Sequence, residues 1–462
     1  MTFHPVILWT DALIYLLIIA SIFCVRWAKR QEQLRSAWRQ ILQSRLAIIS
    51  LVILVTYAAI GFLDSIHFRA TDQNQITSVE SVFDYLVSPL GKNDEKTYSA
   101  PFATHLYNKD IIILPNGLHL RDFPHLKFVD EEQMNPVDNR TLDIIRHCTL
   151  STLGGIVIWF IICALSIMLA AQRQQQKFLT KLNKIVKEKE GIVWRTVLIT
   201  VGVIIVLGFN LFDLSHAYHI LGTDKVGQDV FYETLKSIRT GLIIGTLTTL
   251  ITVPFAITFG MLSGYFRGWV DDVIQYVYTT VNSIPDVLLI AAAVLALQIF
   301  ISNHPEFFSN LVQRADARLL ALCIILGLTS WTNLCRLLRG ETLKLREQDY
   351  VQAAIALGTS RKQILIKHIM PNLMHLVVIA LVMDFSGLVL AEAVLTYVGV
   401  GVDPTTLSWG NMINAARFEL AREPVVWWPL LAAFLFMFPL VICANLFADA
   451  VRDALDPRIR KL

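Results

Sequence analysis

Two carboxylates lie inside an otherwise apolar run, and their charge and spacing would allow them to bind a cationic group together. Asp384 and Glu392 lie eight positions apart within residues 374–399. Eight residues are a little over two helical turns, so the two side chains would lie on similar faces of a helix. An ionisable group at the centre of a membrane costs roughly 2.5–3.5 kcal/mol on insertion scales, so it usually faces protein or water. We expect both to line a translocation path that attracts a cationic group; for Glu392 a structural hydrogen bond is the alternative.

Other chemistry has little support in the sequence. His216 and His219, three positions apart, could suggest a metal pair, but no carboxylate or cysteine set accompanies them. We interpret them as a solvated pair at the membrane surface and predict no metal site. The sequence has no G-x-x-x-x-G-K-[ST] phosphate loop, no H-E-x-x-H zinc helix and no G-x-S-x-G nucleophile turn. We therefore expect no catalytic residues, no enzyme activity and no cofactor in this chain.

The elements that position these residues are membrane-spanning helices. The chain has 462 residues, of which 55% are hydrophobic and 17% are charged, and a soluble protein of this size would carry more charge. A helix needs about 20 apolar residues to cross roughly 30 Å of hydrocarbon. Nine runs are candidates, near 6–25, 45–63, 152–171, 196–212, 240–266, 273–301, 318–335, 374–399 and 426–448. The sequence thus predicts an all-α polytopic membrane protein with about nine spans.

Basic residues predict the orientation of these spans, because Lys and Arg are retained on the cytoplasmic side. They concentrate in four segments, 26–45, 172–195, 336–373 and 452–461. All four fall on one side if the N-terminus lies outside and the C-terminus inside. Topology accounts for the basic clusters and the net charge is only +3, so we expect contact with membrane lipid and none with nucleic acid.

One polar segment between two apolar runs, residues 349–372, predicts a rigid elbow. Asp349–Leu357 is rich in helix formers, and Gly358 supplies the permissive backbone that ends a helix. Ser360 and Gln363 have capping-box spacing for a second helix, and Pro371 would stop it. The second helix would place Ile364, Leu365 and Ile369 on one face. We expect a cytoplasmic docking surface there, and we call residues 349–372 the elbow.

The elbow resembles the loop that marks permease subunits of ABC importers. The matching positions are Gln352, Ala353, Ala354, Gly358, Ser360, His368 and Pro371. The resemblance implies that this loop sits in a cleft of a cytoplasmic ATPase subunit and couples its closure to the transmembrane helices. Gln352 stands where the family usually has glutamate, and Met370 where it has leucine. We therefore expect a contact that depends on shape and apolar packing more than on charge.

A second segment, residues 221–245, resembles the start of the shared core in the oligopeptide/dipeptide/nickel branch of these permeases. The matching positions are Gly222, Thr223, Asp224, Gly227 and Asp229. Asp and Gly favour a tight turn, and an acid at a helix start complements the helix dipole. We interpret the segment as a turn that positions the next helix, with direct substrate contact as the alternative. Residues 264–274, 390–413 and 446–460 match further family segments in order.

The resemblance covers roughly residue 220 to the end and implies a six-helix core with additions. We assign 44–65 to the first core helix, 151–212 to an inserted transmembrane hairpin and 213–462 to the permease core domain. Residues 1–43 would add a further N-terminal helix and a basic linker. Alternatively, 196–212 replaces the first core helix.

Between these segments, residues 66–150 would form an extracytoplasmic loop or small cap. The run Ile111–Leu114 and the turn signal Pro115-Asn116-Gly117 suggest a β-hairpin, with an irregular linker as the alternative. A cap at this place would be positioned to meet a substrate-binding protein.

The resemblance implies a permease subunit of an ATP-driven importer of dipeptides or oligopeptides in a bacterial inner membrane. It implies as partners a second homologous permease, two ABC ATPase subunits that bind ATP and Mg, and an extracytoplasmic substrate-binding protein. A rival interpretation is an ATP-independent secondary transporter or channel. A third is a membrane-embedded assembly or anchoring protein, which would need no polar path.

Overall fold

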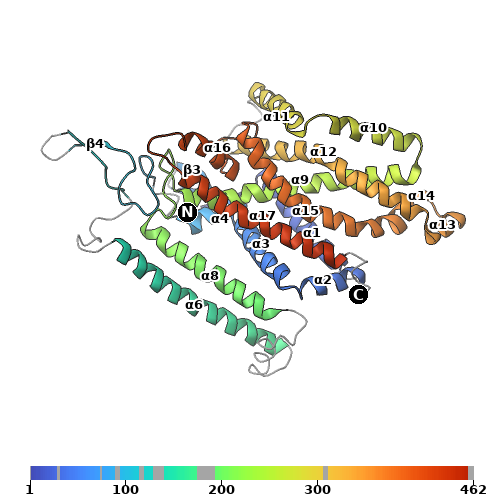
Figure 1. Ribbon diagram of the computed structural model, residues 1–462, viewed down its shortest axis with the longest axis horizontal. Coiled ribbons are helices and arrows are strands. Elements are labelled where there is room, and N and C mark those ends of the chain that lie inside the picture. The colour runs from blue at the N-terminus through green and yellow to red at the C-terminus, as the bar shows by residue number, and fades with distance from the viewer. Residues whose placement is uncertain are drawn as a thin grey trace. The chain divides into compact units, whose positions relative to one another are not determined.

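The computed structural model describes residues 2–28, 32–72, 75–88, 94–113, 119–127, 140–173, 193–304 and 311–455. Helices dominate these ranges, so the prediction of an all-α polytopic membrane protein is confirmed (Figure 1). The helices are α1 (Trp9–Ala28), α2 (Glu32–Ile41), α3 (Arg45–Asp64), α4 (Val82–Leu86), α6 (Arg140–Arg173), α8 (Trp194–Ala217), α9 (Val230–Phe266), α10 (Trp269–Ser283), α11 (Asp286–Asn303), α12 (Leu311–Arg346), α13 (Asp349–Ala356), α14 (Arg361–Ile364), α15 (Met370–Tyr397), α16 (Trp409–Glu419) and α17 (Trp428–Leu455). A π-helical turn, η2 (Leu365–Ile369), joins α14 to α15.

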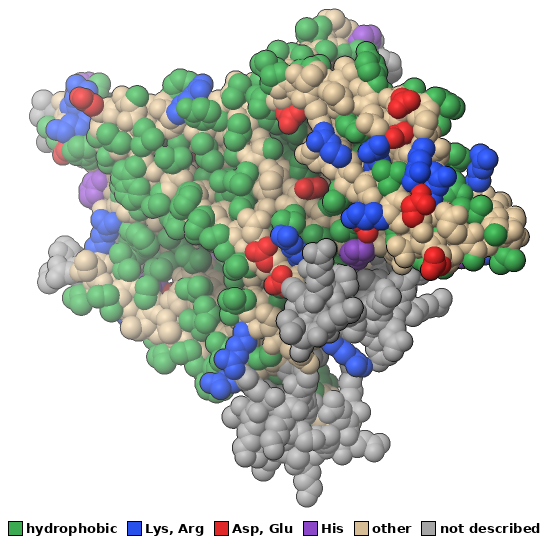
Figure 2. Space-filling model, turned by 45° about the vertical axis from the view of Figure 1, so that its right-hand side comes forward, with side chains coloured by type: hydrophobic (Ala, Val, Ile, Leu, Met, Phe, Trp, Pro, Cys, Tyr) green, Lys and Arg blue, Asp and Glu red, His purple; other side chains and the backbone are tan. Residues whose placement is uncertain are grey.

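Within the described ranges, 7 helical stretches are long and apolar enough to cross a membrane. They are Arg45–Asp64, Arg140–Gln172, Trp194–Ala217, Val230–Phe266, Asp286–Asn303, Arg361–Tyr397 and Trp428–Leu455. The predicted count of nine is not confirmed. The run at 6–25 lies in α1, where Trp9–Ile22 is an apolar stretch below the length of these seven, and 318–335 lies within the more polar α12. Hydrophobic side chains cover broad stretches of the surface in view (Figure 2), as lipid contact requires.

The prediction of one span over residues 273–301 is wrong. Two helices, α10 and α11, cover it, and they are separated at Ile284 and Pro285. Ile284 has an extended backbone with φ −91° and ψ 131°, as expected for a residue that precedes proline. Pro285 lacks an N–H group to continue α10, and it stands instead immediately before α11.

The chain folds into two compact units. Unit 1 comprises Met1–Pro5, Glu32–Arg239 and Ala415–Leu446, and unit 2 comprises Val6–Gln31, Thr240–Asn414 and Phe447–Leu462.

Unit 1 contains the pair α6 and α8, which lie side by side at the place of the predicted inserted hairpin (Figure 1). Polar bonds join the two helices at several levels. Ser151 donates to Asp213 at 2.5 Å, and the Asn210 amide donates to Thr152 at 3.0 Å. Further along, the Trp159 indole donates to a backbone carbonyl of α8 at 2.8 Å. The basic linker between the helices lies largely outside the described residues.

Unit 1 also contains the strands. They are β1 (Thr2–Val6), β2 (His67–Asp72), β3 (Gln75–Ser81), β4 (Asp110–Ile113) and β5 (His119–Asp122). The first three form one sheet in the order β1-β2-β3, and β4 pairs antiparallel with β5. The predicted β-hairpin is therefore confirmed, although its turn, Pro115-Asn116-Gly117, lies outside the described residues. We call residues 66–127 the cap; its extracytoplasmic position and its role stay predictions.

Unit 2 holds two buried apolar clusters. One surrounds Leu247, Leu322 and Leu326 in α9 and α12, and the other lies beneath the elbow. Helix α1 packs on α12, where the Thr10 hydroxyl donates to the Asp316 carboxylate. A buried carboxylate with a hydrogen-bond partner fixes the position of α1 on this helix. The last residues of the predicted C-terminal motif, 456–460, lie outside the described ranges.

Candidate functional site

The elbow is a helix, a sharp turn and a second helix, as the sequence predicts. α13 ends at Ala356, and Gly358 follows in the left-handed region with φ +74°. The N–H of Thr359 donates to Ala354 O at 3.1 Å, and the N–H of Gly358 donates to Ile355 O at 3.0 Å. These two bonds form a Schellman motif, which satisfies carbonyls at the end of α13.

The second arm of the elbow begins at Ser360. Its hydroxyl accepts the N–H of Gln363 at 3.4 Å, so the predicted cap at the start of α14 is confirmed. The prediction that Pro371 stops this helix is wrong, because η2 leads directly into α15. In the wide π turn, the N–H of Met370 donates five residues back to Leu365 O. Pro371 therefore falls in the first turn of α15, where a missing N–H group is tolerated.

Gln352 makes a hydrogen bond in the elbow that needs a side-chain donor. Its Nε2 donates to the backbone carbonyl of Arg346 at 2.9 Å. Arg346 is the last residue of α12, and the final carbonyls of a helix have no partner within the helix. A glutamate carboxylate could not make this bond, because it carries no donor at neutral pH.

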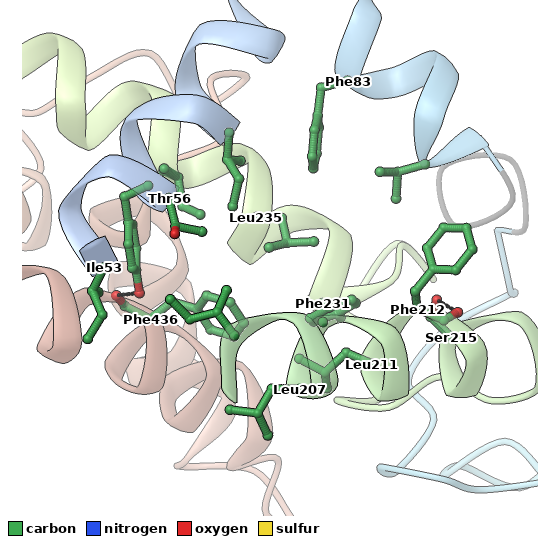
Figure 3. A pocket seen from close by; sticks show the side chains of 16 residues that line it. Ile53, Thr56, Phe83, Leu207, Leu211, Phe212, Ser215, Phe231, Leu235 and Phe436 are labelled. Atoms are coloured by element: carbon green, nitrogen blue, oxygen red, sulfur yellow. Dashed lines mark hydrogen bonds between the residues drawn. The ribbon is translucent and has the colours of Figure 1, made fainter. Parts of the chain in front are cut away.

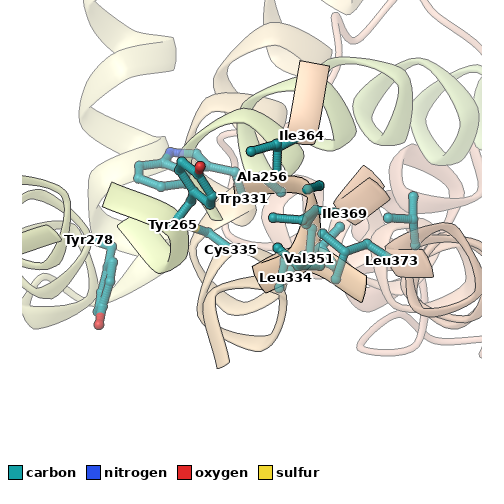
Figure 4. Close-up of a cluster of buried hydrophobic side chains, with 13 residues drawn as sticks. Ala256, Tyr265, Tyr278, Trp331, Leu334, Cys335, Val351, Ile364, Ile369 and Leu373 are labelled. Atoms are coloured by element: carbon teal, nitrogen blue, oxygen red, sulfur yellow. The ribbon is translucent and has the colours of Figure 1, made fainter. Parts of the chain in front are cut away.

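A buried apolar cluster supports both arms of the elbow. Val351 of α13 packs with Ile364 and Ile369 of the second arm, and all three are buried. Figure 4 shows these side chains together with Leu373 of α15 and Trp331 of α12. Ile364 and Ile369 thus share one buried face, as predicted, and Leu365, the third residue predicted there, packs against it partly buried. Motion of the elbow would therefore displace α12 and α15 with it.

Polar contacts tie the two arms together a second time. Asn372 donates to the Tyr350 hydroxyl at 2.9 Å and to the His368 carbonyl at 2.8 Å. The rings of Tyr350 and His368 have their centroids 6.4 Å apart. His368, a residue of the family pattern, therefore contributes its backbone and its ring to the packing between the arms.

The outer side of the elbow exposes apolar and basic side chains. Leu357, immediately before the glycine, is 86% exposed, and Tyr350 and Ile355 on the same helix are also exposed. Ala353 is exposed, whereas Ala354 faces the cluster beneath. Arg361 and Lys362 are exposed at the start of the second arm. This surface could receive a partner with an apolar depression and an acidic rim.

The second predicted motif forms one tight turn in unit 1, before α9. Asp224 accepts the N–H groups of Val226 at 2.9 Å and Gln228 at 2.7 Å. Asp229 Oδ1 accepts the N–H groups of Phe231 and Tyr232, so it caps the first turn of α9. Burial raises the pKa of Asp224 above its ordinary value, although the backbone hydrogen bonds oppose this effect.

The same turn holds the folded cap. Thr223 Oγ1 donates to Thr97 O at 2.9 Å and accepts the N–H of Ser99 at 2.6 Å. Gly227 has φ +89°, and a Cβ atom there would lie 1.9 Å from Glu95 O. The Trp428 indole closes the turn by donating to Thr223 O at 2.9 Å. Gly222, Thr223, Asp224, Gly227 and Asp229 therefore come together, in the geometry expected of a positioning turn.

The two intramembrane carboxylates of α15 have different surroundings. Glu392 is 2% exposed, and its Oε1 accepts the Thr396 hydroxyl at 2.9 Å. Asp384 lies on the exposed surface of α15. Glu392 thus has the contacts of a structural hydrogen bond, which was the alternative role, and Asp384 is the better placed of the two to face a path. A role for either in a path remains a prediction.

The interpretation of His216 and His219 as a solvated pair is wrong for one member. His216 is exposed, but His219 is buried and its Nδ1 lies 2.6 Å from Asp229 Oδ2. The carboxylate that caps α9 thereby also fixes this imidazole, a pairing that the i, i+3 spacing of the histidines did not reveal. Across the part of the chain that the structure describes, no group of three or more His, Cys, Asp or Glu side chains is arranged to hold a metal ion.

One charged cluster was missed in the sequence. Lys236 of α9 lies 2.7 Å from Asp84 of α4 and 3.2 Å from Asp64 at the end of α3. Although burial alone would raise the pKa of Asp84, the charge and hydrogen bond of Lys236 bring it below its ordinary value. Lysine and aspartate near the ends of apolar runs gave the only signal, and nothing in their spacing paired them.

The model of the family described as "Binding-protein-dependent transport system inner membrane component" matches residues 256–461. That match contains the whole elbow and begins after the turn at 222–229.

Individual relatives agree with the family match. The oligopeptide transport system permease protein OppC of Mycobacterium tuberculosis is 30% identical over 244 residues, which are 53% of this chain and 77% of the relative. The dipeptide transport system permease protein DppC of Lactococcus lactis is 30% identical over 240 residues, 52% of this chain and 64% of the relative. The glutathione transport system permease protein GsiD of Pectobacterium atrosepticum is 30% identical over 243 residues, 52% of this chain and 73% of the relative. The resemblance inferred from the motifs is confirmed, and the chain belongs to the inner-membrane components of binding-protein-dependent transport systems, the permease subunits of ABC importers.

Proposed function

We propose that this chain is the permease subunit of an ATP-driven importer of dipeptides or oligopeptides. It forms the translocation path with a second, homologous permease, and two ATPase subunits dock on the cytoplasmic side. A substrate-binding protein delivers the peptide from outside, where the cap lies. The relatives support the substrate class, because their names refer to oligopeptides, dipeptides and glutathione, each of which is a peptide.

The geometry of the elbow is the observation that carries this proposal. Leu357 stands on a turn held by two Schellman bonds, and the arms of that turn are fixed to α12 and α15 by a common buried cluster. A partner that grips Leu357 can therefore move two long helices as one body. With Gln352 occupied by the Arg346 carbonyl, the grip depends on shape and apolar contact.

The same proposal gives the orientation of the chain in the membrane and the separate roles of the permease and the ATPase subunits. The N-terminus lies outside and the C-terminus inside, so that the basic segments and the elbow share the cytoplasmic side. The ATPase partners bind ATP and Mg and perform the hydrolysis, and this chain carries no catalytic residue. Asp384 faces the path and attracts the cationic amino terminus of the peptide.

Leu357→Asp tests the coupling step. Placing a charge in an apolar contact costs several kcal/mol unless it finds a partner, so we expect the purified complex to lose its ATPase subunits. ATP-dependent uptake of a radiolabelled dipeptide into proteoliposomes should fall to background. Val226→Asp is the matched control, because Val226 is 68% exposed on the turn before α9, outside the elbow.

The rival transporters give a different result. If Leu357→Asp and its control transport the dipeptide equally well, the elbow is not the coupling surface. Uptake that follows an ion gradient and persists without any ATPase subunit would assign the chain to the secondary transporters or channels. If the ATPase subunits remain bound and functional but the complex takes up no peptide, only the proposed substrate class is refuted.

A further inference from the structure

A cavity with a volume of about 360 Å³ lies within unit 1. Its walls come from α3, α8, the first turns of α9, and Phe436 of α17, and Phe83 of α4 covers one end (Figure 3). The stretches Arg45–Asp64, Trp194–Ala217, Val230–Phe266 and Trp428–Leu455 that supply these walls are all long and apolar enough to span a membrane. The cavity therefore lies beside the direct contact between α3 and α8, with both helices in its wall.

The chemistry of the wall is almost entirely apolar. Its three hydroxyl groups each donate to a backbone carbonyl: Thr56 to Val52 at 3.0 Å, Tyr57 to Phe436 at 2.8 Å, and Ser215 to Phe212 at 2.7 Å. A buried water needs two to four polar partners, and an apolar cavity that lacks them stays dry and takes apolar ligands. The occupant must therefore be apolar.

The shape of the cavity follows the helix axes. On α8 the lining residues run from Ile204 to Ser215, which at 1.5 Å per residue is about 16 Å. On α3 they run from Ile53 to Ile60, about 10 Å by the same rise. The cavity is thus long and narrow, and it points along the direction in which the membrane-spanning helices run.

Size and chemistry exclude the other occupants. A helix with its side chains is about 10–12 Å across, and α3 and α8 already contact each other directly, so a helix of a partner chain does not fit between them. A peptide substrate would bring amide groups, and each amide left without a partner costs about 1–3 kcal/mol. A single hydrocarbon chain is narrow, apolar and abundant around these helices.

We propose that this cavity binds one acyl chain of a bilayer phospholipid. The chain lies between α3 and α8, where it contacts Leu207 and Leu211 on one side and Ile53 on the other. It fills the space that the protein leaves between the inserted hairpin and the first core helix. Within unit 1, lipid therefore adds to the contact between α8 of the hairpin and α3, and this site is separate from the elbow and from peptide transport.

Gly208 offers a direct way to fill the cavity with protein. It lies on the wall, and a Cβ atom built there has nothing within 4 Å. Gly208→Phe should place its ring in the space of the acyl chain without displacing a neighbour. Gly340→Phe in α12 is the matched control, because that helical glycine also has nothing within 4 Å of an added Cβ and lies outside the cavity.

The experiment uses the full chain in nanodiscs of a phospholipid that carries a photoactivatable diazirine in its acyl chain. Mass spectrometry maps the cross-links. We expect labelling of residues 204–215 and 53–60 in the wild type and in Gly340→Phe, and a several-fold loss in Gly208→Phe. Leu153 and Val157 on the exposed side of α6 are the internal reference, and their labelling should be equal in all three proteins.

Two results would overturn the proposal. The first is equal labelling of the cavity wall in Gly208→Phe and the wild type, measured on protein that elutes as a single species from size exclusion. The second is loss of the wild-type labelling on addition of a dipeptide but not of unlabelled phospholipid, which would assign the cavity to cargo. If Gly208→Phe does not yield folded protein, Gly208→Leu makes the same measurement with a smaller side chain.

Discussion

The left-handed residue at the turn of the elbow allows a test that separates backbone geometry from side-chain contact. Gly358 has φ +74°, and a Cβ atom added there meets nothing within 4 Å. Gly358→Ala therefore introduces no clash, and its whole effect comes from holding an L-residue in the left-handed region. That costs about 1–2 kcal/mol.

The strain should appear in the affinity for the ATPase subunits. The free elbow can relax by fraying the end of α13, but a docked elbow must keep the Schellman turn that presents Leu357. The full 1–2 kcal/mol then opposes docking, which corresponds to a dissociation constant weaker by about five- to thirty-fold. Biolayer interferometry between the permease complex in nanodiscs and the ATPase subunits measures this directly.

Two further variants make the result specific. Gly340→Ala in α12 also adds a Cβ atom in open space, but in a helix, where alanine is favoured, so it should bind like the wild type. Gly358→Asn should keep most of the affinity, because asparagine tolerates the left-handed region. If Gly358→Ala docks as tightly as Gly340→Ala, the turn does not need its observed conformation for docking, and the reasoning fails.

Three other predictions concern the cap and its turn. Trp428→Phe removes the indole bond to Thr223 O and should lower stability by about 1 kcal/mol, seen as a lower thermal midpoint in detergent; an unchanged midpoint contradicts it. Gly227→Ala would place Cβ 1.9 Å from a backbone carbonyl of the cap, so limited proteolysis should cut the cap much faster than in the wild type. Since the pKa of Asp84 is lowered by Lys236 from an ordinary 3.8, its stabilisation is complete above that value and is lost as the pH falls through the lowered pKa. Thermal midpoints between about pH 5 and about pH 2 should therefore fall less steeply in Asp84→Asn than in the wild type; equal slopes would contradict this.

Local signals made the elbow predictable. Gly358 and Ser360 act on their own neighbours within the sequence, through a helix end and a helix cap. Pro371 shows the limit of the same reasoning, because the rule that proline stops a helix is also local. The π turn before it moves the proline to the start of α15, and the sequence has no simple mark for such a turn.

Contacts between distant segments could not be predicted from residue types. Trp428 and Thr223 are separated by 205 positions, and Lys236 and Asp84 by 152. In each pair, one residue supplies the hydrogen-bond partner that the other would lack when buried. Composition and spacing do not indicate which residues will form such a pair. The turn at 222–229 was therefore recognised as a turn, whereas its hold on the cap became visible only in three dimensions.

The polar bonds between α6 and α8 have a consequence for how the protein is made. Alone in lipid, α6 would expose the Thr152 hydroxyl, and α8 would expose Asn210 and Asp213. Polar groups without hydrogen-bond partners are unfavourable in hydrocarbon, so each helix is less stable there by itself. Joined, the two helices satisfy those groups in each other. The pair is thus suited to leave the translocon together, during synthesis, before the core helices that follow exist.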